Sequence, residues 1–241
     1  MPQYSRAPIV EAIIDLRVIS SNTISSLDLA DAIGKIEDYP HRQSLAVNPA
    51  FQFSDGDFSA AIGSLSEGLR YISHDHKKVF QARLDGFTIS VLPPYEDWTL
   101  LQSEAQRLWE IYLSARQPNK LVRVAVRYIN HCPIPKGTLA SQLLNTVPHL
   151  PTQIGILEEF EQRCQMAHPD LEATLLLTQA TLTQPQSQDR SILLDIDLFR
   201  TKSLWDISDK TALWDYMERL RTRKNLIFES CITDDMRSLI Q

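Results

Sequence analysis

Seven acidic and basic residues stand where alternating strands would place them on one face of a sheet. An arginine guanidinium can donate two parallel hydrogen bonds to a carboxylate or a phosphate, so arginines on such a face could anchor a partner or a ligand. A pair of aspartates on one strand, with a glutamate, supplies the hard oxygen ligands that a divalent cation prefers. The same residues could instead pair with each other across strands, which contributes about 0.2 to 1 kcal/mol per pair. The seven candidates are Glu11, Asp15, Arg17, Arg123, Arg127, Asp195 and Asp197.

Other residues offer weaker chemistry. His74 and His76 have the spacing of a surface metal site, but no third ligand is apparent, so we predict turn histidines there. Cys132 follows His131, and neighbours on a strand point to opposite faces, which is poor geometry for a nucleophile and its base. The chain has no C-x-x-C pair, no G-x-S-x-G elbow and no glycine-rich phosphate loop. We therefore assign no catalytic residue, no metal site and no cofactor.

The composition narrows the classes of function. The chain has 241 residues and a formal net charge of -6. A negative charge argues against broad, sequence-independent binding to nucleic acid, which needs lysine and arginine to replace counterions, although a local basic patch is compatible with it. No apolar run approaches the roughly 18 to 20 residues that cross a bilayer, and the first residues lack the layout of a signal peptide. We predict a folded cytoplasmic protein without membrane contact.

The first half of the chain predicts a strand followed by a helix, a meander and a long helix. Apolar residues alternate with acidic and basic ones over 10–18, and Val10, Ala12, Ile14, Leu16 and Val18 form the apolar row, as in a half-buried strand. Helical spacing and turn residues then predict a helix over 27–38, strands over 44–53, 58–64, 69–73 and 79–92, and a long helix from 98 to about 115.

The second half repeats this pattern. Over 121–130, Val122, Val124, Val126 and Tyr128 face one way, while Arg123 and Arg127 face the other. The later elements are a short helix over 138–145, strands over 158–166, 171–183 and 192–200, and an amphipathic helix over 210–224 that Ser208 or Asp209 caps. The tail after Asn225 could dock as a last helix or strand.

The two halves together predict an α+β fold made of duplicated β-α-β(3-4)-α units. The halves are 1–118 and 119–241, packed together as one globular unit. An antiparallel sheet with helices on one face leaves its other face open, and two such units can join edge to edge into one curved sheet. The order of elements in each half is similar to one half of a TATA-binding-protein-like saddle. That analogy of architecture carries no function by itself.

Three stretches of the sequence resemble a known family. They are YSRAPIVEAIIDLRV at the start, RVAVRYIN near the middle and RTRKNLIFESCITDDMR close to the end. They are similar to a sporadically distributed family of bacterial proteins of about this length, whose members begin with an R-A-P-I-x-E-A strand and carry a central R-x-x-x-R-Y-I-N segment. That family has no established function and supplies no catalytic residues. Its patchy distribution implies spread in mobile or defence-related gene neighbourhoods.

We predict a non-enzymatic binding or interaction protein, regulatory or antitoxin-like, that uses the charged sheet face with Arg17, Arg123 and Arg127 as anchors. The acidity of the chain favours a protein partner, and a homodimer that buries the sheet face agrees equally well with these residues. One alternative is nucleic-acid recognition on the sheet, which needs a positive stripe on that face. A second alternative is a metal-dependent hydrolase that uses Asp195 and Asp197 with Glu11.

Overall fold

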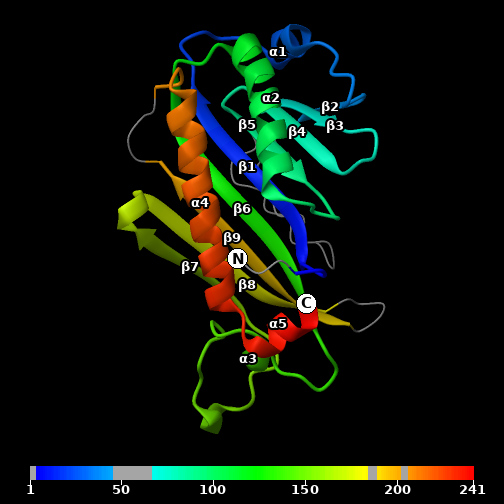
Figure 1. The fold of residues 1–241 in the computed structure, drawn as a ribbon, viewed down its shortest axis with the longest axis vertical. Coiled ribbons are helices and arrows are strands. Elements are labelled where there is room, and N and C mark those ends of the chain that lie inside the picture. Colours follow the sequence, from blue (N-terminus) through cyan, green and yellow to red (C-terminus); the bar gives the residue numbers. More distant parts are fainter. Residues whose placement is uncertain (1–3, 46–66, 184–188, 202–205) are drawn as a thin grey trace.

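One antiparallel sheet with helices on one face organises the protein (Figure 1). The computed structural model describes residues 4–45, 67–183, 189–201 and 206–241. Within them, nine strands form a single open sheet in which every neighbouring pair is antiparallel. This arrangement confirms the predicted α+β fold class.

The strands and helices follow each other in two similar series. The first series is β1 (Ile9–Ile19), α1 (Ser26–Ile33), β2 (His41–Leu45), β3 (Gly68–Ile72), β4 (Lys78–Arg83), β5 (Gly86–Val91) and α2 (Trp98–Arg116). The second series is β6 (Lys120–Ile134), α3 (Ala140–Leu143), β7 (Glu161–His168), β8 (Ala173–Thr183), β9 (Arg190–Arg200), α4 (Lys210–Cys231) and α5 (Asp234–Ile240). Short 3-10 segments occur at Thr152–Ile154 and Pro169–Leu171.

The two halves of the chain meet at the centre of the sheet. The strand order is β2-β3-β4-β5-β1-β6-β9-β8-β7, so β1 and β6 pair in the middle. Figure 1 shows these two long strands crossing the molecule side by side. Each half has the order strand, helix, antiparallel strands and long helix, with four strands after α1 and three after α3. An origin of this order by internal duplication stays a prediction.

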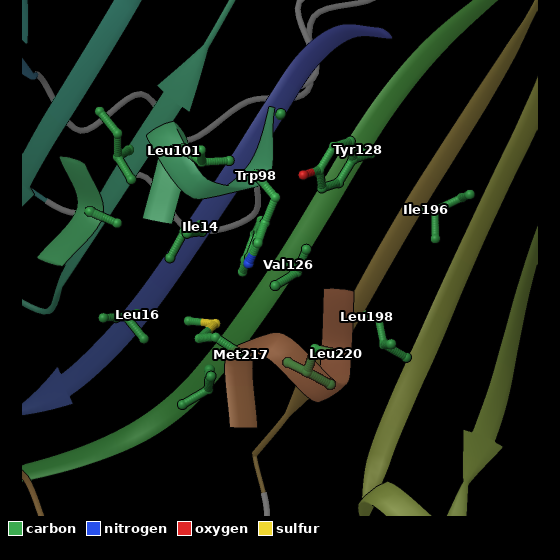
Figure 2. Packing of buried hydrophobic residues seen from close by; sticks show 14 of the residues in the cluster. Ile14, Leu16, Trp98, Leu101, Val126, Tyr128, Ile196, Leu198, Met217 and Leu220 are labelled. Carbon is green, nitrogen blue, oxygen red and sulfur yellow. The ribbon is translucent and has the colours of Figure 1, made fainter. Parts of the chain in front are cut away.

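The main core lies between the sheet and its helices. α2 packs on β5, while α4 packs on β6 and β9. Residues three or four apart share one face of a helix, and Leu101, Ala105 and Leu108 of α2 are accordingly buried on the sheet side. Figure 2 shows the same arrangement for α4, whose Met217 and Leu220 lie over Val126 of β6. In the described part of the chain, no helix combines the length and the apolar character needed to span a membrane.

Two β-bulges change the facing that simple alternation predicts. In β1 the register with β6 shifts just before Glu11, and Val10 packs with Ile13 on the open face instead of joining the helix-side row. In β6 a second shift places Leu121 in the helix-side core, where we expected Val122. Side chains alternate between the two faces of the sheet on either side of a bulge, but the extra residue at the bulge shifts this alternation by one. A sequence pattern alone therefore assigns the residues next to a bulge to the wrong face.

The helix α1 is shorter than its sequence pattern predicts. It begins after Ser25, one residue before the expected cap Ser26, and Ser25 forms a reciprocal capping box with Asp28. It ends at Gly34, whose φ of 66° lies in the left-handed region that glycine adopts readily. The following residues are not helical, although Tyr39 among them is buried in the core.

Other boundaries differ from the prediction in ways that matter for the site. The run expected as one strand over 79–92 is a hairpin, because Leu84 and Asp85 form a turn between β4 and β5. The strand expected over 44–53 overlaps β2, and its residues after Leu45, like the strand expected over 58–64, lie outside the described residues. Asp209 caps α4, as one of the two predicted caps, but the helix continues to Cys231.

Candidate functional site

Strand alternation gathers the predicted site residues on the sheet face opposite the helices. Asp15, Arg17, Arg123, Arg127, Asp195 and Asp197 all take part in ion pairs there. Glu11, at the bulge of β1, contributes to the field that raises the pKa of Arg127. Arg83, Asp85 and Thr88 of the β4–β5 hairpin join the paired residues. We use the name open-face network for the following nine residues: Asp15, Arg17, Arg83, Asp85, Thr88, Arg123, Arg127, Asp195 and Asp197.

Asp15 is the centre of the open-face network, and its side chain is only 3% exposed. Arg83 Nη2 and the hydroxyl of Thr88 each donate to Asp15 Oδ1 at 2.7 Å. Arg123 Nη1 donates to Oδ2 at 2.5 Å, and Arg17 Nε lies 3.5 Å from the same oxygen. Burial by itself raises the pKa of Asp15, but the guanidinium groups of Arg83, Arg123 and Arg17 outweigh it and hold the pKa well below its usual range. Asp15 is therefore an ionised, fully paired carboxylate.

A glycine makes room for this arrangement. Gly86 stands opposite Arg17 in the β1–β5 pair. A Cβ atom on Gly86 would lie 2.5 Å from the carbonyl oxygen of Leu16 and 3.1 Å from Arg83 Nη2. The first distance is far shorter than any real contact with a backbone atom, so a larger residue would push the two strands apart. The tight hairpin and its glycine thus let Arg83 reach Asp15.

The network continues across β6 and β9 through two arginine–aspartate pairs. Arg123 Nη2 lies 3.0 and 2.9 Å from the two carboxylate oxygens of Asp197, and its guanidinium stacks 4.6 Å from the ring centre of Phe199. Arg127 donates from Nε and Nη2 to the two oxygens of Asp195 at 2.8 and 2.6 Å. Burial raises the pKa of Asp197, and the charges of Asp195 and Asp15 raise it further against the opposing effect of Arg123 and Arg127. Both aspartates therefore already have arginine partners.

The contacts on the open face can be compared with the three uses predicted for it, which are partner binding by arginines, nucleic-acid binding and metal binding. The predicted anchors Arg17, Arg123 and Arg127 all bind aspartates of the same chain. In the open-face network, the cations Arg17, Arg83, Arg123 and Arg127 are matched by Asp15, Asp85, Asp195 and Asp197, so the network forms no positive stripe. The described residues also contain no group of three or more histidine, cysteine, aspartate or glutamate side chains that could hold a metal ion.

A second site, which we did not predict from the sequence, lies on the helix side of the sheet. A cavity of about 490 Å³ opens between β6, α4, the beginning of α2 and the chain that precedes β1. We name it the helix-side pocket. Tyr128 and Asn130 of β6 and Lys224 and Phe228 of α4 line it. Tyr128 projects from β6 on the same side as Trp98, the first residue of α2 (Figure 2).

Lys224 is the unusual residue of the helix-side pocket. Its side chain is buried, with 7% of its surface exposed, and its amine lies 3.5 Å from the centre of the Tyr128 ring. No carboxylate within the described residues forms an ion pair with it. Burial, with a smaller contribution from the nearby charge of Arg221, lowers the pKa of Lys224 to about 7. The face of the Tyr128 ring attracts the charged form and works in the opposite direction.

Two hydroxyl groups meet beside Lys224. The Tyr95 and Tyr128 hydroxyl oxygens are 2.8 Å apart, and the two rings pack edge to face with their centres 5.5 Å apart. Burial raises the pKa of Tyr95 to about 12 and that of Tyr128 well above its ordinary value. Both phenols therefore stay protonated at neutral pH, and they provide O–H groups instead of charge.

The outer wall of the pocket is tied down by polar contacts. The hydroxyl of Tyr4 donates to both carboxylate oxygens of Glu229, at 2.9 and 3.0 Å, and Arg237 Nε donates to one of them at 3.1 Å. The backbone N–H of Arg6 donates to the carbonyl of Ile240 at 3.0 Å. The chain before β1 is thus fastened to α4 and α5, so the pocket has a formed wall.

The sequence did contain one signal for this site. Leu213, Met217, Leu220 and Lys224 follow each other at steps of four, three and four residues, which keeps them on one face of α4. A lysine therefore occupies a position where the helix pattern demands an apolar residue. Helical spacing alone predicts that the helix ends at Lys224, where a lysine is ordinary, and it therefore does not predict that this side chain is buried.

Comparisons of the chain with family models, with curated proteins and with solved structures gave no match. The family resemblance of the three sequence stretches and the analogy with a TATA-binding-protein-like saddle therefore stay predictions.

Proposed function

We propose that this protein binds a small molecule in the helix-side pocket, and that the ligand carries an anionic group. The proposal keeps the binding role predicted from the sequence but moves the site from the open face to the helix side. The observation that carries it is Lys224, a buried amine that lines a cavity of about 490 Å³ and has no acidic partner among the described residues. Pockets of about 300 to 1,000 Å³ are typical of small-molecule sites.

The charges around the pocket favour an anion over a cation. An ammonium group buried without a counter-ion is costly, and an anionic ligand would offset that cost while accepting charge-assisted hydrogen bonds worth about 1.5 to 3 kcal/mol each. Arg221, one turn before Lys224, adds a second cation to the lining. Of the three acids in the lining, Asp97 caps α2, Glu229 binds Tyr4 and Arg237, and Glu96 is exposed to solvent, where water screens its charge.

The rest of the lining favours an organic body attached to that anionic group. Phe228, Ile9 and Trp98 contribute apolar and aromatic surface. Ligand pockets generally combine such surface with a few polar groups that fix orientation. An aromatic or aliphatic carboxylate or phosphate therefore suits the pocket better than a bare inorganic ion.

The open-face network supports a structural role in preference to a partner site. Recruiting Arg123 or Arg127 to an external carboxylate or phosphate would break an ion pair in which both oxygens of an aspartate of the same chain accept from the arginine. Removing one partner from a buried pair costs about 3 to 5 kcal/mol. The regulatory or antitoxin-like setting that the family resemblance implies stays a prediction.

The proposal predicts ligand-dependent stabilisation that needs Lys224. We expect benzoate or phenyl phosphate, at millimolar concentration, to raise the melting temperature of the wild type by a few degrees more than neutral benzamide does, because a ligand that binds only the folded state stabilises it. The Lys224→Met variant should lose this difference. Differential scanning fluorimetry of the purified proteins measures it.

The matched control is Lys210→Met, which removes an exposed lysine at the start of the same helix. It should keep the anion-specific stabilisation at the wild-type level. The proposal would be contradicted if Lys224→Met retained the difference between benzoate and benzamide, or if the wild type showed none with either anion.

A further inference from the structure

Lys224 has the surroundings of a reactive amine. Lys224 is the only buried lysine among the described residues, and it lines a cavity that a small molecule could enter. The Tyr128 ring covers one side of the amine, and the charge of Arg221 lowers the pKa of the amine further. A lysine that is desolvated and placed next to another cation is the arrangement in which the amine becomes a nucleophile near neutral pH.

We propose that Lys224 forms a Schiff base with the carbonyl group of an aldehyde or 2-oxo acid held in the helix-side pocket. The inference rests on the proposed function for the location of the site and for the anionic character of the ligand. It adds the chemical class of that ligand, a carbonyl compound with an acidic group, and a covalent step that simple binding does not require.

The step is balanced without an oxidant or a reductant. The lone pair of the neutral amine attacks the carbonyl carbon, a C–N bond forms, and the carbonyl oxygen takes a proton to give a carbinolamine. The hydroxyl group then leaves as water after a second protonation, while the nitrogen gives up its protons. The net change is amine plus carbonyl to imine plus water. The protonated hydroxyls of Tyr95 and Tyr128, 2.8 Å apart, are proton donors already present at the pocket.

The neutral amine of Lys224 is available mainly because the side chain is buried, and the charge of Arg221 adds to the effect. With a pKa of about 7, about half of the Lys224 side chains carry a neutral amine at pH 7, against fewer than about one in a thousand for an ordinary lysine. The charged and titratable groups of the pocket lining are Arg221 and Glu229 from α4, Tyr128 from β6, Glu96, Asp97 and Tyr95 from the segment before α2, and Tyr4 from the chain before β1.

A place for the acidic group of the ligand follows from the same lining. Arg221 forms an ion pair with Glu218 at 3.1 Å, and its side chain keeps about a third of its surface exposed. A guanidinium in that position can donate to a carboxylate on the ligand while the neighbouring carbonyl carbon meets Lys224. A 2-oxo acid or an aldehyde acid carries both groups within one small molecule.

The test is trapping of the imine with glyoxylate, a small aldehyde that carries a carboxylate. Sodium cyanoborohydride delivers hydride to the imine carbon and leaves a stable carboxymethyl group on the lysine. Peptide mapping by mass spectrometry compares the labelling rates of Lys224 and Lys210. We expect Lys224 to label at least about tenfold faster at pH 7, with a rate that levels off above pH 8, whereas the Lys210 rate keeps rising toward pH 10.

Labelling of Lys224 no faster than Lys210, or with the same pH profile, would overturn the proposal. The Lys224→Arg variant separates covalent chemistry from binding, because arginine keeps the charge but forms no such imine under these conditions. It should retain the stabilisation by benzoate and lose the selective label. Stabilisation by benzoate without selective labelling in the wild type would leave the binding function standing and remove the Schiff base. Absence of both would remove both.

Discussion

At the scale of single residues, Asp15 is expected to contribute more to the stability of the fold than any other member of the open-face network. Asp15 holds Arg83 and Arg123 at hydrogen-bond distance, and its carboxylate is almost fully removed from water. Each guanidinium would be left without this counter-charge if the carboxylate disappeared. The cost of such an orphaned charge is larger than the net contribution of the intact pair.

We therefore expect Asp15→Asn to lower the free energy of unfolding by about 3 to 5 kcal/mol at pH 7, as urea denaturation would measure. The matched control is Glu110→Gln, which removes the acid of an exposed pair with Lys210. Surface pairs of this kind are worth about 1 kcal/mol at most, so the control should unfold close to the wild type. A loss of stability no larger than that of the control would contradict a central role for Asp15.

The pKa of Asp15 also determines how the difference in stability between the wild type and Asp15→Asn should depend on pH. The folded-state pKa is lowered from an ordinary value of 3.8, so the stabilisation is complete above that value and is lost as the pH falls toward the folded-state pKa. The difference in stability between wild type and Asp15→Asn should be constant from about pH 5 to 8 and should shrink below about pH 4. A difference that persists unchanged at low pH would show that it has another cause.

The residues of the open face were largely predictable, and those of the pocket were not. Period-two alternation is enough to place Asp15, Arg127 and Asp195 on one face, since it depends only on strand geometry. The contact between Asp15 and Arg83 depends on the hairpin turn between β4 and β5, and this turn is not evident in the sequence because the two strands read as one apolar run. The reactivity of Lys224 depends on which segments pack around it, and local sequence patterns carry no such information.

At the scale of elements, α4 connects the core to the pocket. Its buried face begins with leucine and methionine residues that pack on β6 and β9, reaches the cavity at Lys224 and continues to Cys231. The same helix also carries apolar residues on its outer face, among them Leu226, which is 51% exposed. Two leucines on one helix thus have opposite surroundings and provide an internal comparison.

We expect Leu220→Ala to lower the free energy of unfolding by about 2 to 5 kcal/mol, because it leaves a cavity in a core where Leu220 is fully buried. Leu226→Ala should change it by no more than about 0.5 kcal/mol, since the side chain faces water for half of its surface. Guanidinium titrations followed by circular dichroism compare the two variants. Equal effects would contradict the packing of α4 on the sheet.

Element boundaries were harder to predict than element types. α2 and α4 were found from helical spacing because long amphipathic helices repeat the signal over several turns. α1 offered fewer turns, and its end depends on the left-handed backbone of Gly34 more than on its apolar pattern. The bulges of β1 and β6 arise from the pairing of two distant strands, so no local pattern could have located them.

At the scale of the whole molecule, the pairing of β1 with β6 joins the halves 1–118 and 119–241. Ile13 and Ile14 of β1 point to opposite faces of the sheet and are both buried. The pairing of β1 with β6, which we call the central seam, therefore carries buried side chains on both faces of the sheet. Separating the halves would expose both apolar surfaces at once.

We expect the fragments 1–118 and 119–241 to co-purify as a folded complex when they are expressed together, and each to fail to fold when expressed alone. The chain connection between α2 and β6 is short, so cutting it removes little besides covalent linkage. Size-exclusion chromatography and circular dichroism of the separate and joint fragments measure the outcome. A cooperative unfolding transition in either isolated fragment would contradict the dependence of one half on the other.

The position of Asp15 at this seam has a consequence for assembly. If β1 slid by two residues between its neighbours, Ile13 or Arg17 would take the place of Asp15 next to Arg83 and Arg123. Apolar alternation does not distinguish such a slip, because it repeats every two residues. Charge does distinguish it, since the slipped form would bury two guanidinium groups against an isoleucine or a third cation. Asp15 therefore favours one register of β1 between its neighbouring strands and disfavours the registers that are shifted by two residues.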